Sequence, residues 1–73
     1  MVPHDALIRA LRSRGYSHKG QSDRVTMWKK PGDAKRIMVR RNSSHSEEAA
    51  RSWLKQSGMS DDEIDRFFAS VNN

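Results

Sequence analysis

Two short runs of β-favouring residues stand on either side of a turn signal and predict a β-hairpin in the middle of the chain. The runs are Val25–Trp28 and Ile37–Val39, and the chain-breaking pair Pro31-Gly32 lies between them. Seven of the eighteen residues from 24 to 41, which we call the ribbon, are Lys or Arg, and one is acidic. An exposed ribbon of this charge is expected to meet a negatively charged partner.

Helical spacing of apolar residues predicts a helix before the ribbon and two after it. The first runs from about His4 to Arg14 and is followed by an extended stretch toward Lys19. The polar segment Asn42–Ser46 leads into the second, which ends near Gln56. Capping-box spacing in residues 44–47 makes Ser44 the predicted N-cap of the second helix, and residues 60–63 open the third in the same way.

The large apolar side chains divide between the helices and the ribbon. Trp53, Phe67 and Phe68 fall on apolar helix stripes and are expected in the core. Trp28 is also expected there, with an exposed anchor as the alternative. The methionines Met27 and Met38 alternate along the strands and are candidates to fill gaps in the core.

The element order is helix, three strands, helix, helix, in one domain spanning residues 1–73. We therefore predict an α+β fold, with a three-stranded antiparallel sheet and the helices packed on one face. The chain has no cysteine and no apolar run of the length of a membrane span, so we expect a cytoplasmic monomer without a membrane segment.

Charge is distributed unevenly along the sequence. Residues 1–41 carry eleven Lys or Arg against three Asp, a net charge of +8, whereas residues 42–73 carry a net charge of −3, which gives +5 for the chain. A positive face and a negative end are the expected result. Nucleic acid is the default partner for such a positive face, and a merely solvated surface is the alternative.

Three segments resemble the HicA-type toxin family. Leu7–Tyr16 looks like its first helix and the entry to its first strand, Lys30–Val39 is similar to its hairpin, and Ala50–Ser60 resembles its last helix. The resemblance implies a fold like that of double-stranded-RNA-binding domains, α-β-β-β-α, with one further helix here. Those toxins are messenger-RNA ribonucleases.

The catalytic histidine of those toxins has no counterpart here. Their Gly-Ser-His segment falls on residues 23–25 when aligned from Pro31, or on residues 21–23 when aligned on the serine, and neither contains histidine. Acid–base cleavage of RNA needs a group that exchanges protons near neutral pH. We therefore predict a protein that is not an enzyme, although His18 near Asp23 is a weak candidate for a metal site or an acid–base pair.

All three histidines, His4, His18 and His45, are expected at the surface, because their spacing matches no local metal motif. No cofactor or metal is predicted.

A second resemblance concerns the whole chain. A 73-residue, cysteine-free, basic sequence is similar to small phage-encoded regulators that bind host bacterial RNA polymerase. The resemblance implies contacts with the large polymerase subunits, inhibition of transcription initiation through σ-factor displacement, and in some cases antitermination. Glu47 and Glu48 at the start of a helix disfavour RNA there and favour a mixed-charge surface for a protein partner.

Three interpretations follow, in this order: a phage-type polymerase regulator, a HicA-like RNA-binding protein that is inactive or altered, and a basic accessory protein for DNA or RNA. The predicted partner-binding residues combine ribbon cations with polar residues near the helix starts: Asp5, Lys29, Lys30, Arg36, Arg40, Arg41, Ser44 and Ser46.

Overall fold

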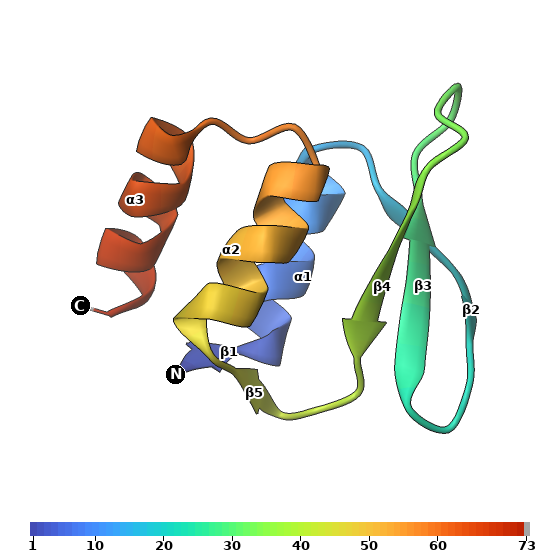
Figure 1. The fold of residues 1–73 in the computed structure, drawn as a ribbon, viewed down its shortest axis with the longest axis horizontal. Coiled ribbons are helices and arrows are strands. Elements are labelled where there is room, and N and C mark those ends of the chain that lie inside the picture. Colours follow the sequence, from blue (N-terminus) through green and yellow to red (C-terminus); the bar gives the residue numbers. More distant parts are fainter. Residues whose placement is uncertain (73) are drawn as a thin grey trace.

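The basic ribbon forms two strands of a three-stranded antiparallel sheet, as predicted. In the computed structural model, which describes residues 1–72, the strands β2 (Ser17–Gln21), β3 (Val25–Lys29) and β4 (Arg36–Arg40) lie side by side in that order (Figure 1). Strands β3 and β4 pair in one unbroken register, whereas the pairing of β2 with β3 shifts between His18 and Gly20.

The turn of the ribbon is built by its proline and glycine. The Asp33 N–H donates to the Lys30 carbonyl at 3.1 Å, which closes a four-residue turn with Pro31 and Gly32 at its centre. Gly32 has a φ of +81°, a value that the third position of a type II turn requires and that other residues rarely adopt. The predicted breaker pair therefore sets the strand register.

Alternation along the strands gives the sheet one buried and one open face. Thr26 and Trp28 of β3 and Ile37 and Val39 of β4 are buried, while their neighbours in sequence are half-buried or exposed. The Trp28 indole N–H donates to the Thr26 hydroxyl at 2.8 Å, and that hydroxyl donates to the Val39 carbonyl at 3.1 Å. The buried polar atoms of this face are thus satisfied within the sheet.

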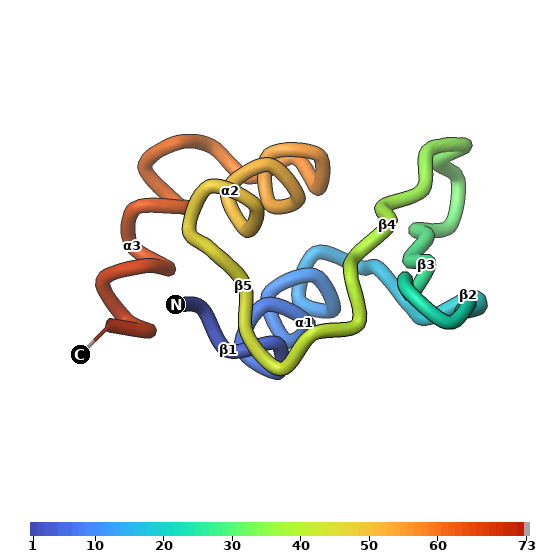
Figure 2. Tube along the Cα trace, turned by 60° about the horizontal axis from the view of Figure 1, so that its bottom comes forward, coloured from blue at the N-terminus to red at the C-terminus, as the bar shows by residue number. Residues whose placement is uncertain are grey.

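Helices α1 (His4–Ser13) and α2 (Glu47–Gln56) cover the buried face (Figures 1 and 2). Leu7 and Leu11 of α1 and Leu54 of α2 are completely buried. The Arg12 guanidinium lies 5.2 Å from the centre of the Trp28 ring, so a cation–π contact also joins α1 to the sheet. The predicted α+β class, with helices packed on one face of the sheet, is confirmed.

The third helix, α3 (Asp61–Val71), lies on the side of α1 and α2 that faces away from the sheet (Figure 2). Its predicted capping box is present, since the Glu63 N–H donates to the Ser60 hydroxyl and the Ser60 N–H donates to the Glu63 carboxylate. The bond from the Ser60 backbone lowers the pKa of Glu63, and Arg14 lowers it further. Ile64 and Phe68 join the common core.

The predicted cap of α2 was wrong by two residues. The N-cap is Ser46, whose hydroxyl accepts from the Ala49 N–H at 3.1 Å. Ser44 instead belongs to a two-residue strand, β5 (Ser44–His45), which pairs with β1 (Val2–Pro3). The capping-box spacing gave the wrong residue because the pairing of β5 with β1 keeps Ser44 in a strand, and the helix therefore begins only after it.

This strand pair also corrects the prediction that all histidines are superficial. His45 is only 3% exposed, its Nε2 lies 2.9 Å from Nδ1 of His4, and its ring packs edge-on against Trp53. Burial lowers the pKa of His45, and the neighbouring His4 lowers it further. The two imidazoles hold the N-terminus against the start of α2.

Two predictions about large side chains need revision. Met38 does not fill the core but is 45% exposed on the open face, because it occupies the opposite phase of the strand from Ile37 and Val39. Trp53 packs against the core while remaining half-buried. Trp28, at 3% exposure, is the more deeply buried tryptophan. None of the helices within residues 1–72 has the length and apolarity that crossing a membrane demands.

We expect Trp28→Ala to lower the free energy of unfolding by about 3–5 kcal/mol, because it removes a buried ring and leaves the Thr26 hydroxyl without its donor. Trp53→Ala should cost roughly half as much, since part of that ring is already in water. Urea unfolding followed by circular dichroism checks both values. An equal or larger cost at Trp53 would contradict the assigned burial.

Stability should also depend on pH through His45. Its pKa is lowered in the folded state, so the unfolded chain takes up the proton more readily. The free energy of unfolding is therefore greatest above the ordinary histidine pKa of about 6.5 and decreases as the pH falls below that value toward the lowered pKa.

Urea unfolding at about pH 7.5 and about pH 5.5 measures this linkage. His45→Gln should lose most of the difference, while His18→Gln, at an exposed site, should keep it. A dependence that survives in His45→Gln would contradict the assignment.

Candidate docking surface

The sheet face that no helix covers gathers cations around an apolar centre. We call it the open face. It consists of the outward-pointing side chains of β3 and β4: Val25, Met27, Lys29, Arg36, Met38 and Arg40.

The register of the two strands fixes how these side chains sit. Met27 lies directly opposite Met38, Lys29 opposite Arg36, and Val25 opposite Arg40. Side chains that face each other in this way are in contact distance across an antiparallel pair. The open face is therefore a methionine pair with cations at both of its ends.

The ribbon cations have no acidic partner within residues 1–72. The ion pairs of that part of the chain involve other bases, and none includes a Lys or Arg of the ribbon. The Arg36 guanidinium instead contacts the Met27 sulfur at 3.6 Å. Like charges at Lys29 and Arg36 lie directly opposite each other and repel, which an anionic partner would relieve.

Three of the four acidic residues of α3 form ion pairs elsewhere. Arg14 pairs with Glu63 at 3.2 Å, Arg51 with Asp65 at 2.7 Å, and Lys55 with Asp61 at 3.2 Å. These pairs hold α3 against α1 and α2, at the opposite end of the molecule from the ribbon (Figure 1). The negative end therefore compensates the bases of the helices and leaves the charge of the open face uncompensated.

The structure brings together only part of the predicted partner-binding set. Lys29, Arg36 and Arg40 share the open face. Lys30 lies in the turn, where its aliphatic chain runs beside Gly15. The Arg41 side chain folds back and donates to the Ser22 carbonyl at 2.9 Å.

The polar residues of the predicted partner-binding set lie away from the open face, in a strand pair and at the starts of two helices. Ser44 pairs with Pro3 in the β1–β5 strand pair, and Ser46 caps α2. Asp5 is exposed in the first turn of α1, where its charge favours the helix N-terminus.

A hollow lies where β4 ends and the β2–β3 turn approaches it. It measures about 430 Å³ and is lined by Asp23, Arg24, Val25, Arg40, Arg41 and Asn42. Its lining includes residues 23–25, one of the two segments on which the Gly-Ser-His segment of the resembled toxins falls. Three guanidinium groups there can bind an anion, but a guanidinium does not exchange protons near neutral pH.

Within the described residues, His18 forms no ion pair with Asp23. The His18 ring packs edge-on against Trp28, with 5.4 Å between ring centres. Within the described residues, no group of three His, Cys, Asp or Glu side chains is arranged to hold a metal ion.

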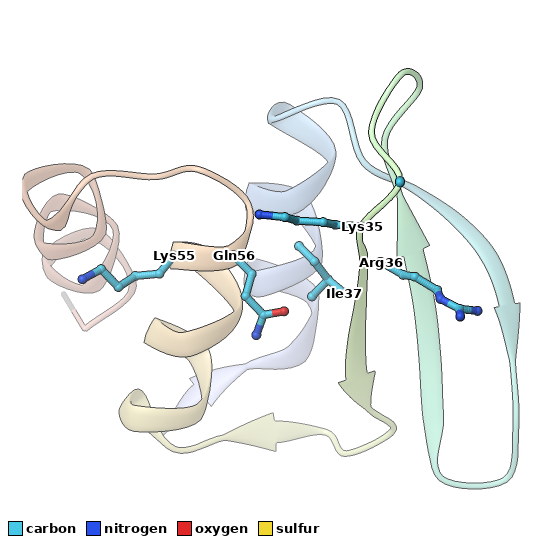
Figure 3. Close-up of a pocket in the computed structure, with 6 residues that line it drawn as sticks. Lys35, Arg36, Ile37, Lys55 and Gln56 are labelled. Carbon is cyan, nitrogen blue, oxygen red and sulfur yellow. The ribbon is translucent and has the colours of Figure 1, made fainter.

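Sequence reasoning missed two contributors. The methionine pair was assigned to the core, although the alternation of β4 places Met38 in phase with the exposed Arg36 and Arg40. Lys35 and Gln56 were not singled out, and they line a groove between β4 and α2 (Figure 3). No signal in the sequence brings those two residues together.

Comparison with protein-family models, curated proteins and solved structures finds no match to this chain. The open face and the arginine-lined hollow are therefore interpreted from their own chemistry.

We expect the protein to leave RNA intact, because the arginine-lined hollow offers anion binding without a proton-transfer group. Incubation with a labelled messenger RNA, followed by gel electrophoresis, checks this. The matched variant is His18→Ala, which should behave like the natural chain. Cleavage by the natural chain that disappears in His18→Ala would contradict the expectation and identify His18 as the acting group.

Proposed function

We propose that this chain is a non-catalytic binding module that docks its open face on an acidic surface of bacterial RNA polymerase, as a regulator of the phage-encoded type. The observation that carries the proposal is the uncompensated charge of the open face. Lys29, Arg36 and Arg40 surround a methionine pair, of which Met38 is exposed and Met27 half-buried, and these cations form no ion pair with a carboxylate within the described residues. A surface of this kind is stabilised when a partner supplies the missing negative charge.

The composition of the open face favours a protein partner over a single-stranded nucleic acid. Its centre is Met27 opposite Met38, and methionine is enriched in the cores of protein interfaces, where a polar rim surrounds an apolar centre. Single-stranded nucleic acids are bound by stacking on exposed aromatic rings. The aromatic residue of β3, Trp28, points to the core instead.

The consequence for the host follows from the resemblance. Regulators of that type contact the large polymerase subunits, displace the σ factor and inhibit initiation, and some act in antitermination. A small module with a positive docking face suits such a role, because electrostatic steering accelerates association with a negatively charged surface.

A HicA-like RNA-binding protein is the second candidate, and two observations favour it. The order α1, β2, β3, β4, α2 is the one that the resemblance to the toxins implies. The arginine-lined hollow also includes residues 23–25, on which the catalytic segment of the toxins falls when the sequences are aligned from Pro31. In this alternative the chain retains RNA affinity and has lost the group that cleaves.

A pull-down from a bacterial lysate separates the candidates. The tagged natural chain should retain polymerase subunits at low salt, and Lys29→Glu with Arg36→Glu should lose most of them, because the double variant reverses two cations of the open face.

The matched control is Arg9→Glu with Arg66→Glu, which changes the net charge equally at exposed sites on α1 and α3, away from the sheet. It should retain the subunits. Circular dichroism verifies that both variants fold.

Failure of the natural chain to retain polymerase would overturn the first candidate. Affinity for random RNA that falls steeply with salt would then support the second, since binding to phosphates releases counterions.

A further inference from the structure

Strand β4 ends the sheet with a regular edge that carries no bulge. It is the last strand in the order β2-β3-β4, and its register with β3 continues without interruption from Arg36 to Arg40. The opposite edge strand, β2, carries the irregularity between His18 and Gly20. Bulges of that kind are one of the means by which proteins block edge strands, and β4 has none.

The hydrogen-bond pattern shows which backbone groups of β4 face outward. The Arg41 N–H donates to the Arg24 carbonyl at 2.9 Å, which makes these two residues a hydrogen-bonded pair of the ladder. Because such pairs alternate in antiparallel sheets, Val39 and Ile37 also bond to β3. The N–H and C=O groups of the residues between them therefore point to the open edge: Arg36, Met38 and Arg40.

Two hollows lie along this edge, on the side of α2. One of about 490 Å³ is at the start of β4 and is lined by Lys35, Arg36, Ile37, Lys55 and Gln56, with Ala34. The other, of about 300 Å³, is at the end of β4, between Arg40 and Trp53.

In Figure 3, Lys35 and Ile37 extend from β4 toward the helices, the Gln56 amide lies in the gap between α2 and β4, and Arg36 extends over β3. A strand added beside β4 would thus meet cationic side chains on the open face of the sheet and polar groups on the side of α2.

We propose that β4 is an acceptor edge for an extended acidic segment of a partner protein, which adds a fourth strand to the sheet. The outward backbone groups supply the hydrogen bonds, as in other cases of strand addition. Side chains of the added strand would lie opposite Arg36, Met38 and Arg40 on the open face. The segment that fits these three positions alternates acidic, apolar and acidic residues, each separated by one residue that faces α2.

Charge selects this occupant over a second copy of the chain. If two β4 strands paired antiparallel with Met38 opposite its copy, each Arg36 would lie opposite an Arg40. Like charges at directly opposed positions destabilise a pair of strands. The same cations stabilise an acidic segment, so they both prevent self-association and select the partner.

This inference rests on the proposed function, in that the partner segment belongs to the protein on which the open face docks. It can nevertheless be tested without that partner. The probe is a blocked synthetic peptide of sequence Thr-Glu-Thr-Val-Thr-Glu-Thr, added to the full chain labelled with ¹⁵N and followed by amide hydrogen exchange.

We expect the amides of Arg36, Met38 and Arg40 to exchange about tenfold more slowly at high peptide concentration, because they become hydrogen-bonded. N-methylation of the peptide valine should abolish the effect, since that N–H faces β4. N-methylation of an adjacent threonine, whose N–H faces away, should preserve it.

Charge reversal provides the second arm. Arg36→Glu with Arg40→Glu should weaken peptide binding on the order of tenfold, because two favourable cross-strand charge pairs become unfavourable. The control pair Arg9→Glu with Arg66→Glu, on α1 and α3, should bind as the natural chain does.

Chemical-shift changes without slower exchange at the three amides would overturn the inference, since they would show attraction to charge without strand pairing. Protection of the β2 amides in their place would overturn it as well. Protection of the β4 amides in a chain that fails to retain polymerase would support the acceptor edge while removing the first proposed partner.

Discussion

The packing of the inner face of the ribbon against two helices is the constraint on which the rest of the molecule depends. Trp28 is the largest side chain of this face. Its ring fills the space beneath α1, its indole N–H is satisfied by Thr26, and Arg12 closes over it from the helix. Since alternate residues of a strand point to opposite faces, the burial of Trp28 and Ile37 compels Met27, Met38 and their cationic neighbours to face water. The docking surface is thus a consequence of the core.

Ion pairs within residues 1–72 involve other bases and leave the cations of that surface without a carboxylate partner. The carboxylates of α3 neutralise Arg14, Arg51 and Lys55, and these pairs are exposed and individually weak. These carboxylates lie on α3, at the opposite end of the molecule from the ribbon (Figure 1), so they do not compensate its charge. The proposed polymerase partner and the proposed acidic strand both follow from this separation. The cations that would attract the strand also keep two β4 edges apart.

Prediction from the sequence succeeded where the signal was local. The hairpin around Pro31-Gly32, the spans of the three helices and the cap at Ser60 depend on residues a few positions apart, and each is present. It failed where distant segments compete. Ser44 fits a capping box but pairs with the N-terminal strand β1 instead, and the same strand pair buries His45. Of the predicted docking residues, Lys29, Arg36 and Arg40 share one face because they share one phase of two paired strands.

The sequence by itself determined the α+β class and the basic ribbon, since these depend on residue type, spacing and order. Only the tertiary structure decided which face of the ribbon is buried, which carboxylates are already paired, and that β4 rather than β2 ends the sheet with a regular edge. The physical reason is that burial and charge compensation are properties of neighbours in space. A period of two divides a strand into two faces but does not say which one the helices will cover.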